Sequence, residues 1–140
     1  MKALDTPVLL DLLRGSPEAR HLVRGLGNEE LATTELNLWE LTALAYGDKR
    51  GGIEHRLAAL DRLRRKLTVL PFDNKSAAAS LRALANSRTG RPSPVTALIV
   101  ATLEGHGCSH WVTTPEAVPQ GLPPGLKVEK YVKKKTHHGK

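Results

Sequence analysis

The chain has 140 residues, of which 40% are hydrophobic and 4% aromatic, and its net charge is +7. That length suits one domain with a core of aliphatic side chains, and the single cysteine, Cys108, excludes an internal disulfide and a cysteine-rich metal site. No apolar run approaches the roughly 20 residues of a membrane-spanning helix, and the first residues lack the apolar stretch of a signal peptide. We therefore expect a cytoplasmic protein with no membrane partner.

Short apolar runs and amphipathic runs alternate along the chain. Thr6 and Ser16 each precede a proline, so each is expected to cap a helix that begins at that proline. The strands are expected at residues 2–5, 31–34, 67–70, 109–114 and 127–132. The helices are expected at residues 7–14, 16–26, 36–47, 53–66, 77–87 and 95–105.

This alternation predicts an α/β fold in which helices cover both faces of a mostly parallel sheet of four to five strands. No repeat or linker divides the chain. We expect one domain over residues 1–129 and a basic tail over residues 130–140. Trp39, Trp111 and Cys108 lie within apolar runs and are expected in the core.

Two carboxylates follow predicted strands. Asp5 ends the first strand, and Glu40 lies in the helix that follows the second. Open parallel sheets bind ligands beyond the carboxyl ends of their strands, so these two side chains are expected to face each other there. Carboxylates in such a place hold Mg²⁺ or Mn²⁺, which can assist phosphodiester cleavage. A folding role for Asp5 remains open, because a carboxylate at the start of a helix is favourable without any metal.

Several stretches, taken in order, resemble the PIN domains of VapC-type toxins over nearly the whole chain. They are "LDTPVLLDLL", "TTELNLWELTALAYG", "VLPFDNKSAAASLRALANSRTGRPS", "LIVATLEGHGCSHWVTT" and "VPQGLPPGLKVEKY". The resemblance implies a three-layer α/β/α fold and a divalent-metal site of four acids. It also implies cleavage of single-stranded RNA with Mg²⁺ or Mn²⁺ as the cofactor.

Only two of the four family acids carry over, Asp5 and Glu40, and the resemblance makes them the remaining catalytic and metal-binding residues. Thr96 stands at the position of the third acid and Pro115 at that of the fourth. Glu116, one residue further on, could serve as a metal ligand if the loop shifts. Losing parts of a cooperative site commonly costs orders of magnitude in rate, so we predict a catalytically inactive protein that needs no metal cofactor. The alternative is a Mg²⁺-dependent endoribonuclease toxin of the VapC type.

Most of the positive charge lies at the C-terminal end. Residues 127–140 carry six lysines and one glutamate, which places +5 of the net +7 there. Such a tail either binds a polyanion or is solvated, and we predict binding to ribosomal or another structured RNA, within a ribosome or other ribonucleoprotein particle. The predicted RNA-binding residues are Lys127, Lys130, Lys133, Lys134, Lys135, Lys140, Arg62, Arg64, Arg65 and Lys66.

Two further expectations concern partners and source. The family resemblance makes a second copy of the chain or an antitoxin-like protein a candidate partner. The chain contains one methionine and one glutamine, and this scarcity of thermolabile residues suggests a thermophilic source.

Overall fold

The computed structural model describes residues 1–47, 52–79, 94–119 and 122–132. The strands are β1 (Lys2–Leu4), β2 (Leu31–Thr34), β3 (Thr68–Leu70), β4 (His110–Thr113) and β5 (Lys127–Lys130). The helices are α1 (Thr6–Leu13), α2 (Pro17–Gly25), α3 (Glu35–Gly47), α4 (Ile53–Arg65), α6 (Pro94–Gly105) and the short 3₁₀ helix η1 (Pro115–Ala117). Residues 74–79 are also helical, and the rest of the helix expected up to residue 87 lies outside the described residues. No helix of the described segments is both long and apolar enough to cross a membrane.

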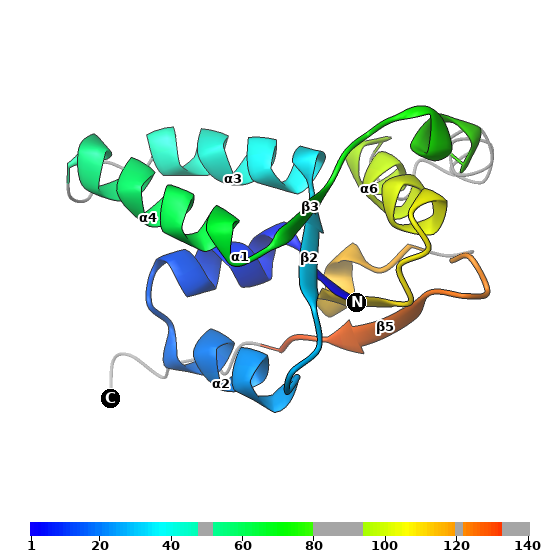
Figure 1. The fold of residues 1–140 in the computed structure, drawn as a ribbon. Coiled ribbons are helices and arrows are strands. Elements are labelled where there is room, and N and C mark those ends of the chain that lie inside the picture. The colour runs from blue at the N-terminus through cyan, green and yellow to red at the C-terminus, as the bar shows by residue number, and fades with distance from the viewer. Residues whose placement is uncertain (48–51, 80–93, 120–121, 133–140) are drawn as a thin grey trace.

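The five strands form one parallel sheet in the order β3-β2-β1-β4-β5. β1 is central, because Ala3 pairs with Ala32 of β2 on one side and with Trp111 of β4 on the other. Helices α1, α2 and α4 cover one face of the sheet and α6 covers the other (Figure 1). The predicted three-layer α/β/α fold with a parallel sheet is therefore confirmed.

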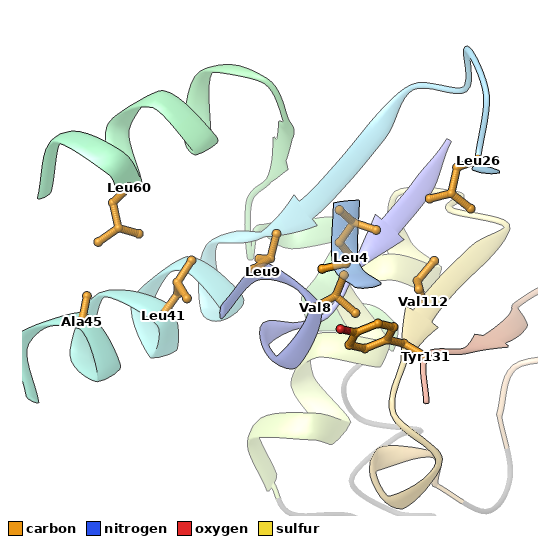
Figure 2. Close-up of a cluster of buried hydrophobic side chains, with 10 residues drawn as sticks. Leu4, Val8, Leu9, Leu26, Leu41, Ala45, Leu60, Val112 and Tyr131 are labelled. Carbon is orange, nitrogen blue, oxygen red and sulfur yellow. The ribbon is translucent and has the colours of Figure 1, made fainter. Parts of the chain in front are cut away.

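Each face of the sheet carries its own core. Neighbouring residues of a strand point to opposite faces, so Leu4 and Val112 join the first core while Ala3 and Trp111 join the second. Figure 2 shows the first core, in which side chains of α1, α3 and α4 meet those of β1 and β4. Trp111 is 1% exposed and Cys108 is also buried, as predicted.

Trp39 is not in the core. Its side chain is 69% exposed, so the predicted core position is wrong. Helix α3 is apolar on several sides, and its sequence does not mark which side packs inward. The packed side is that of Leu41 and Ala45, which belong to the first core.

The start of α1 differs from expectation by one residue. Asp5, not Thr6, is the N-cap, and Thr6 and Pro7 are the first two helical residues. The strand ends one residue earlier than expected and the helix follows at once, which places the Asp5 carboxyl at the junction. Ser16 caps α2 as predicted, accepting a hydrogen bond on Oγ from a backbone N–H three residues later (3.4 Å).

The strand order creates a switch point beside β1. From β1 the chain continues to β2 and β3 on one side of the sheet, and it later returns to β4 and β5 on the other side. Open α/β sheets bind ligands beyond the carboxyl ends of their strands at such a point. The end of β1 is therefore the place at which this fold presents a site.

Tyr131 ties the end of β5 to α1. It is 3% exposed, and its backbone N–H donates to the carbonyl oxygen of Thr113 at 2.7 Å. Its hydroxyl donates to Oδ2 of Asp11, itself buried in α1, at 2.8 Å. Burial and this hydrogen bond raise the pKa of Tyr131 to about 12. Residues 133–140 of the predicted basic tail lie outside the described residues, so the tail stays a prediction.

Candidate active site

Asp5 lies at the carboxyl end of the central strand. Its backbone N–H donates to the carbonyl oxygen of Val112 at 2.9 Å, which extends the pairing of β1 with β4 by one residue. The side chain is 5% exposed, and Thr113 of β4 donates its hydroxyl hydrogen to Oδ2 of Asp5 at 2.6 Å. The carboxylate is thus held at the switch point by the neighbouring strand.

Glu40 reaches the same edge from α3. The helix begins directly after β2, and Glu40 lies half-buried in it. The hydroxyl of Thr6 donates to Oε1 of Glu40 at 2.9 Å. Because Thr6 directly follows Asp5, the fold brings both predicted acids to one edge of the sheet.

Asn37 lies between the two acids. Its side-chain nitrogen, Nδ2, donates to Oδ1 of Asp5 at 2.8 Å and to the hydroxyl oxygen of Thr6 at 3.0 Å. Its side-chain oxygen accepts a hydrogen bond from the hydroxyl of Thr34 at 2.7 Å. Asn37 is 1% exposed, so a continuous buried network runs from Thr113 through Asp5, Asn37 and Thr6 towards Glu40.

Burial raises the pKa of the Asp5 carboxyl above its usual range. Hydrogen bonds from Thr113, from the backbone N–H of Thr6 and from Asn37 act in the opposite direction but do not outweigh burial. The buried carboxylate is therefore held by neutral donors and is harder to ionise than an exposed aspartate.

This raised pKa predicts how the metal-free protein responds to pH. The folded protein keeps a proton on Asp5 at pH values where the unfolded chain, with a pKa of 3.8, has released it. The stabilisation from this group is complete below that unfolded pKa and is lost as the pH rises through the folded pKa. When the pH is raised from about 4 to about 7, the unfolding free energy of the wild type should therefore fall more than that of Asp5→Asn. Urea unfolding in the presence of a chelator measures both free energies. Equal losses in the two proteins would contradict the prediction.

The sequence resemblance predicts Thr96 and Pro115 in place of the third and fourth acids. Thr96 lies half-buried in the first turn of α6, and Pro115 is exposed at the start of η1. Glu116 is exposed on η1. Within the described segments no three His, Cys, Asp or Glu side chains are grouped closely enough to hold an ion, so Asp5, Glu40 and Glu116 do not form such a group.

The donor set at this edge fits one hard divalent ion. A carboxylate offers about four acceptor positions, and the hydroxyl of Thr113 and the amide of Asn37 use two of those on Asp5. The remaining positions and the Glu40 carboxylate are the available oxygen ligands. Mg²⁺ is commonly held by one or two carboxylates together with substrate phosphates, so one ion matches these residues and a second does not.

The basic run of α4 lies at the opposite edge of the sheet. α4 leads into β3, which is parallel to the other strands, so its last turn lies near their amino ends. Arg64 and Arg65 are largely exposed and both pair with Asp61, at 3.1 and 2.8 Å. Arg62 and Lys66 are exposed as well. These four residues therefore do not line the edge where the acids lie.

The lysines of the C-terminal end divide between the two edges. In the pairing of β5 with β4, Lys127 lies opposite His110 at the amino end of β4, and Lys130 lies opposite Thr113 at its carboxyl end. Thr113 is the residue whose hydroxyl bonds Asp5. Both lysines are exposed. The remaining predicted lysines lie outside the described residues, namely Lys133, Lys134, Lys135 and Lys140.

A groove of about 380 Å³ lies on the face covered by α1, α2 and α4. Apolar side chains of all three helices line it, among them Leu12 of α1, Val23 of α2 and Leu63 of α4. Arg20 of α2 and Arg62 and Lys66 of α4 also line it. Among the described residues, none of these three cations forms an ion pair. The groove therefore combines apolar surface with uncompensated positive charge.

Sequence reasoning missed Asn37 and Thr113. The spacing of Thr34 and Asn37 is that of a capping pair, since the Thr34 hydroxyl oxygen accepts from the Asn37 backbone N–H at 3.1 Å. That spacing could have marked Asn37 as a fixed polar side chain near the end of β2. Nothing in the sequence indicates that Thr113 bonds Asp5, because the bond depends on the pairing of β1 with β4.

A family model described as "PIN domain" matches residues 2–114, which include both acids and their bonding partners. A comparison with curated proteins found no significant match.

Several solved structures share this fold. VapBC2 from Rickettsia felis, bound to a promoter DNA fragment, is 16% identical with a TM-score of 0.76, over 94% of this chain and 98% of that chain. DNA-bound VapBC from Salmonella typhimurium is 22% identical with a TM-score of 0.73, and the match again covers 94% of this chain and 98% of that chain. VapC20 from Mycobacterium tuberculosis, described as a sarcin-ricin loop cleaving toxin, is 18% identical with a TM-score of 0.62. This match covers 79% of this chain and 87% of that chain.

Proposed function

Because the chain belongs to the PIN domain family, we propose that it is a metal-dependent endoribonuclease of the VapC toxin type with a reduced, single-ion site. The observation that carries the proposal is the meeting of Asp5 and Glu40 at the carboxyl end of the central strand. Both acids are those that the sequence resemblance predicts as family acids. No other described pair of acids is held by a buried network at the switch point.

Asp5 and Glu40 are the proposed ligands, and Glu116 stays a further expectation. One Mg²⁺ or Mn²⁺, when bound, would supply an activated water and neutralise phosphate charge. The chain's own contribution is to hold both carboxylates in place through Thr6, Asn37 and Thr113 before any substrate arrives.

Structured RNA, ribosomal RNA in particular, is the proposed substrate. The net charge of +7 favours a polyanion, and Lys130 is exposed on the same edge as the acids. One structurally similar protein is described as cleaving the sarcin-ricin loop, which supports this choice of substrate.

A second candidate is an RNA-binding protein without catalysis. The observation that favours it is the replacement of two family acids by Thr96 and Pro115. Such a protein would keep the phosphate contacts of the basic residues and need no metal.

One experiment separates the two candidates. End-labelled ribosomal RNA fragments are incubated with the protein and Mn²⁺, with a chelator as the matched control. Cleavage that requires Mn²⁺ supports the nuclease. RNA binding without cleavage, with an affinity that falls steeply with salt, supports the second candidate, and removal of residues 133–140 should then flatten the salt dependence. A protein that neither cleaves nor binds the RNA would contradict both candidate functions.

We also propose that the groove between α1, α2 and α4 receives a helical segment of an antitoxin-like protein. The apolar lining fits one face of an amphipathic helix. Arg20, Arg62 and Lys66, which form no ion pair with the described part of the chain, fit acidic residues beside that face. Charge complementarity therefore favours an acidic amphipathic partner over a neutral one.

Reversing two of these charges should weaken this binding. The probe is a fluorescent synthetic helix with leucines on one face and glutamates beside them. The double variant Arg62→Glu/Lys66→Glu should lower its affinity at least about tenfold, measured by fluorescence anisotropy. Arg64→Glu/Arg65→Glu is the matched control, because those two arginines pair with Asp61 outside the groove. Equal losses of affinity in the two double variants would contradict binding of the helix in this groove.

A homodimer is the other proposed assembly. Five large apolar side chains are exposed on α3 and α4: Trp39, Leu44, Tyr46, Ile53 and Leu57. Exposed apolar side chains of this kind can pack against those of a second copy through a two-fold axis. Native mass measurement of the purified chain tests this, and a monomer at micromolar concentration would exclude a stable dimer.

A further inference from the structure

Neutral donors occupy the space between the two acids. One atom, Nδ2 of Asn37, bonds both Oδ1 of Asp5 and the hydroxyl oxygen of Thr6, and that hydroxyl in turn donates to Glu40. An ion that bridged Asp5 and Glu40 along this path would need to displace the amide. The amide nitrogen thus stands in the place where a cation would otherwise satisfy Oδ1 of Asp5.

The amide is fixed in this orientation. Its oxygen accepts from the Thr34 hydroxyl, and both hydrogens on its nitrogen are used, one by Asp5 and one by Thr6. Thr34 in turn is fixed because its own oxygen accepts from the backbone N–H of Asn37. Asn37 and Thr34 are fully buried, so water does not compete for these bonds. A flipped amide would turn its oxygen towards the Asp5 carboxylate, which is unfavourable.

We propose that Asn37 is a positioning residue that aligns Asp5 and Glu40 in the metal-free protein and competes with a divalent ion for Oδ1 of Asp5. This inference rests on the proposed metal site. It assigns the amide two opposing effects: it stabilises the metal-free fold, and it weakens metal binding by occupying an acceptor position on Oδ1 of Asp5.

The two effects have the same origin. Without Asn37, the buried Asp5 carboxylate loses a donor and therefore costs folding free energy. A cation then becomes the favourable replacement, and the volume of the missing side chain gives room for it. Loss of the amide should therefore make the protein less stable without metal and more responsive to metal.

Thermal unfolding with increasing Mn²⁺, in the absence of RNA, tests the proposal. Asn37→Ala should unfold at a lower temperature than the wild type without metal, and its Mn²⁺ affinity should be at least about tenfold higher. Asn37→Asp keeps the shape but places a third carboxylate beside Asp5, so it should depend on Mn²⁺ even more strongly. Thr42→Ala, which removes a hydroxyl bonded only to a backbone oxygen of α3, is the matched control and should respond to Mn²⁺ as the wild type does.

Equal Mn²⁺-induced shifts in the wild type and both Asn37 variants would overturn the proposal. A measurement on the wild type keeps it testable if the variants do not fold. The side-chain amide signals of Asn37 in an NMR spectrum should move on addition of Mg²⁺, and unchanged signals at saturation would also overturn it. Failure of the proposed function is seen separately: tight Mn²⁺ binding by the variants without RNA cleavage by the wild type would sustain this inference and reject the nuclease.

Discussion

Replacing Asp5 by alanine should abolish Mn²⁺-dependent RNA cleavage, with a fall in rate of at least about 10³-fold. Asp5 is one of only two described acids at the switch point, and no third acid joins them among the described residues. Removing it leaves Glu40 as the sole carboxylate, which is too little charge to hold an ion beside RNA phosphates. Cleavage of end-labelled RNA at fixed Mn²⁺, resolved on a denaturing gel, measures the effect.

Two controls isolate the role of the carboxylate. Asp5→Asn keeps the shape of the side chain and should lose cleavage to a similar extent, which separates charge from packing. Asp61→Ala removes an acid of α4 that pairs with Arg64 and Arg65 on the surface and should leave the rate unchanged. Undiminished cleavage by the Asp5 variants would show that the activity belongs to another site or to a contaminant.

Replacing Gly105 by alanine should destabilise the fold by about 3 kcal/mol. A Cβ at Gly105 would lie 2.6 Å from the carbonyl oxygen of Lys75, 2.7 Å from its carbonyl carbon and 3.0 Å from the backbone nitrogen of Ser76. These are backbone atoms, which cannot rotate away as a side chain can. The end of α6 and the start of the helical residues 74–79 would have to move apart, and the melting temperature should fall by roughly 10 °C.

Gly47→Ala is the matched control. Gly47 ends α3, and a Cβ there would meet no atom within 4 Å. Its unfolding free energy should change little or rise slightly, because alanine favours the helix over glycine. Urea unfolding followed by tryptophan fluorescence compares the two variants. Equal stability of both would show that the approach of residue 75 to α6 is not tight.

The order of strands and helices could be predicted because its signals are local. Apolar runs followed by proline predicted the strands near residues 67–70 and 109–114, and the cap at Ser16 predicted the start of a helix. The meeting of Asp5 and Glu40 also followed from sequence, since parallel strands place their carboxyl ends at one edge.

Features that depend on distant pairing could not be predicted in the same way. Asn37 contacts Asp5 only because β2 lies beside β1 in one particular register. The exposed face of α3, with Trp39, reflects which neighbours pack against a helix that is apolar on several sides. Arg62 and Lys66 lie away from the acids because α4 leads into the amino end of β3. Their predicted role in RNA binding rested on charge alone, without regard to the direction of this helix.

The bond between Thr113 and Asp5 joins residues 108 positions apart in the chain. During synthesis the first strand emerges long before the strand that completes its network, because contacts of large sequence separation form late. An incomplete nascent chain therefore has the Asp5 carboxylate but not the environment that positions it. The proposed site is therefore complete only when nearly the whole domain has been made, so a product truncated before β4 should lack the proposed nuclease activity.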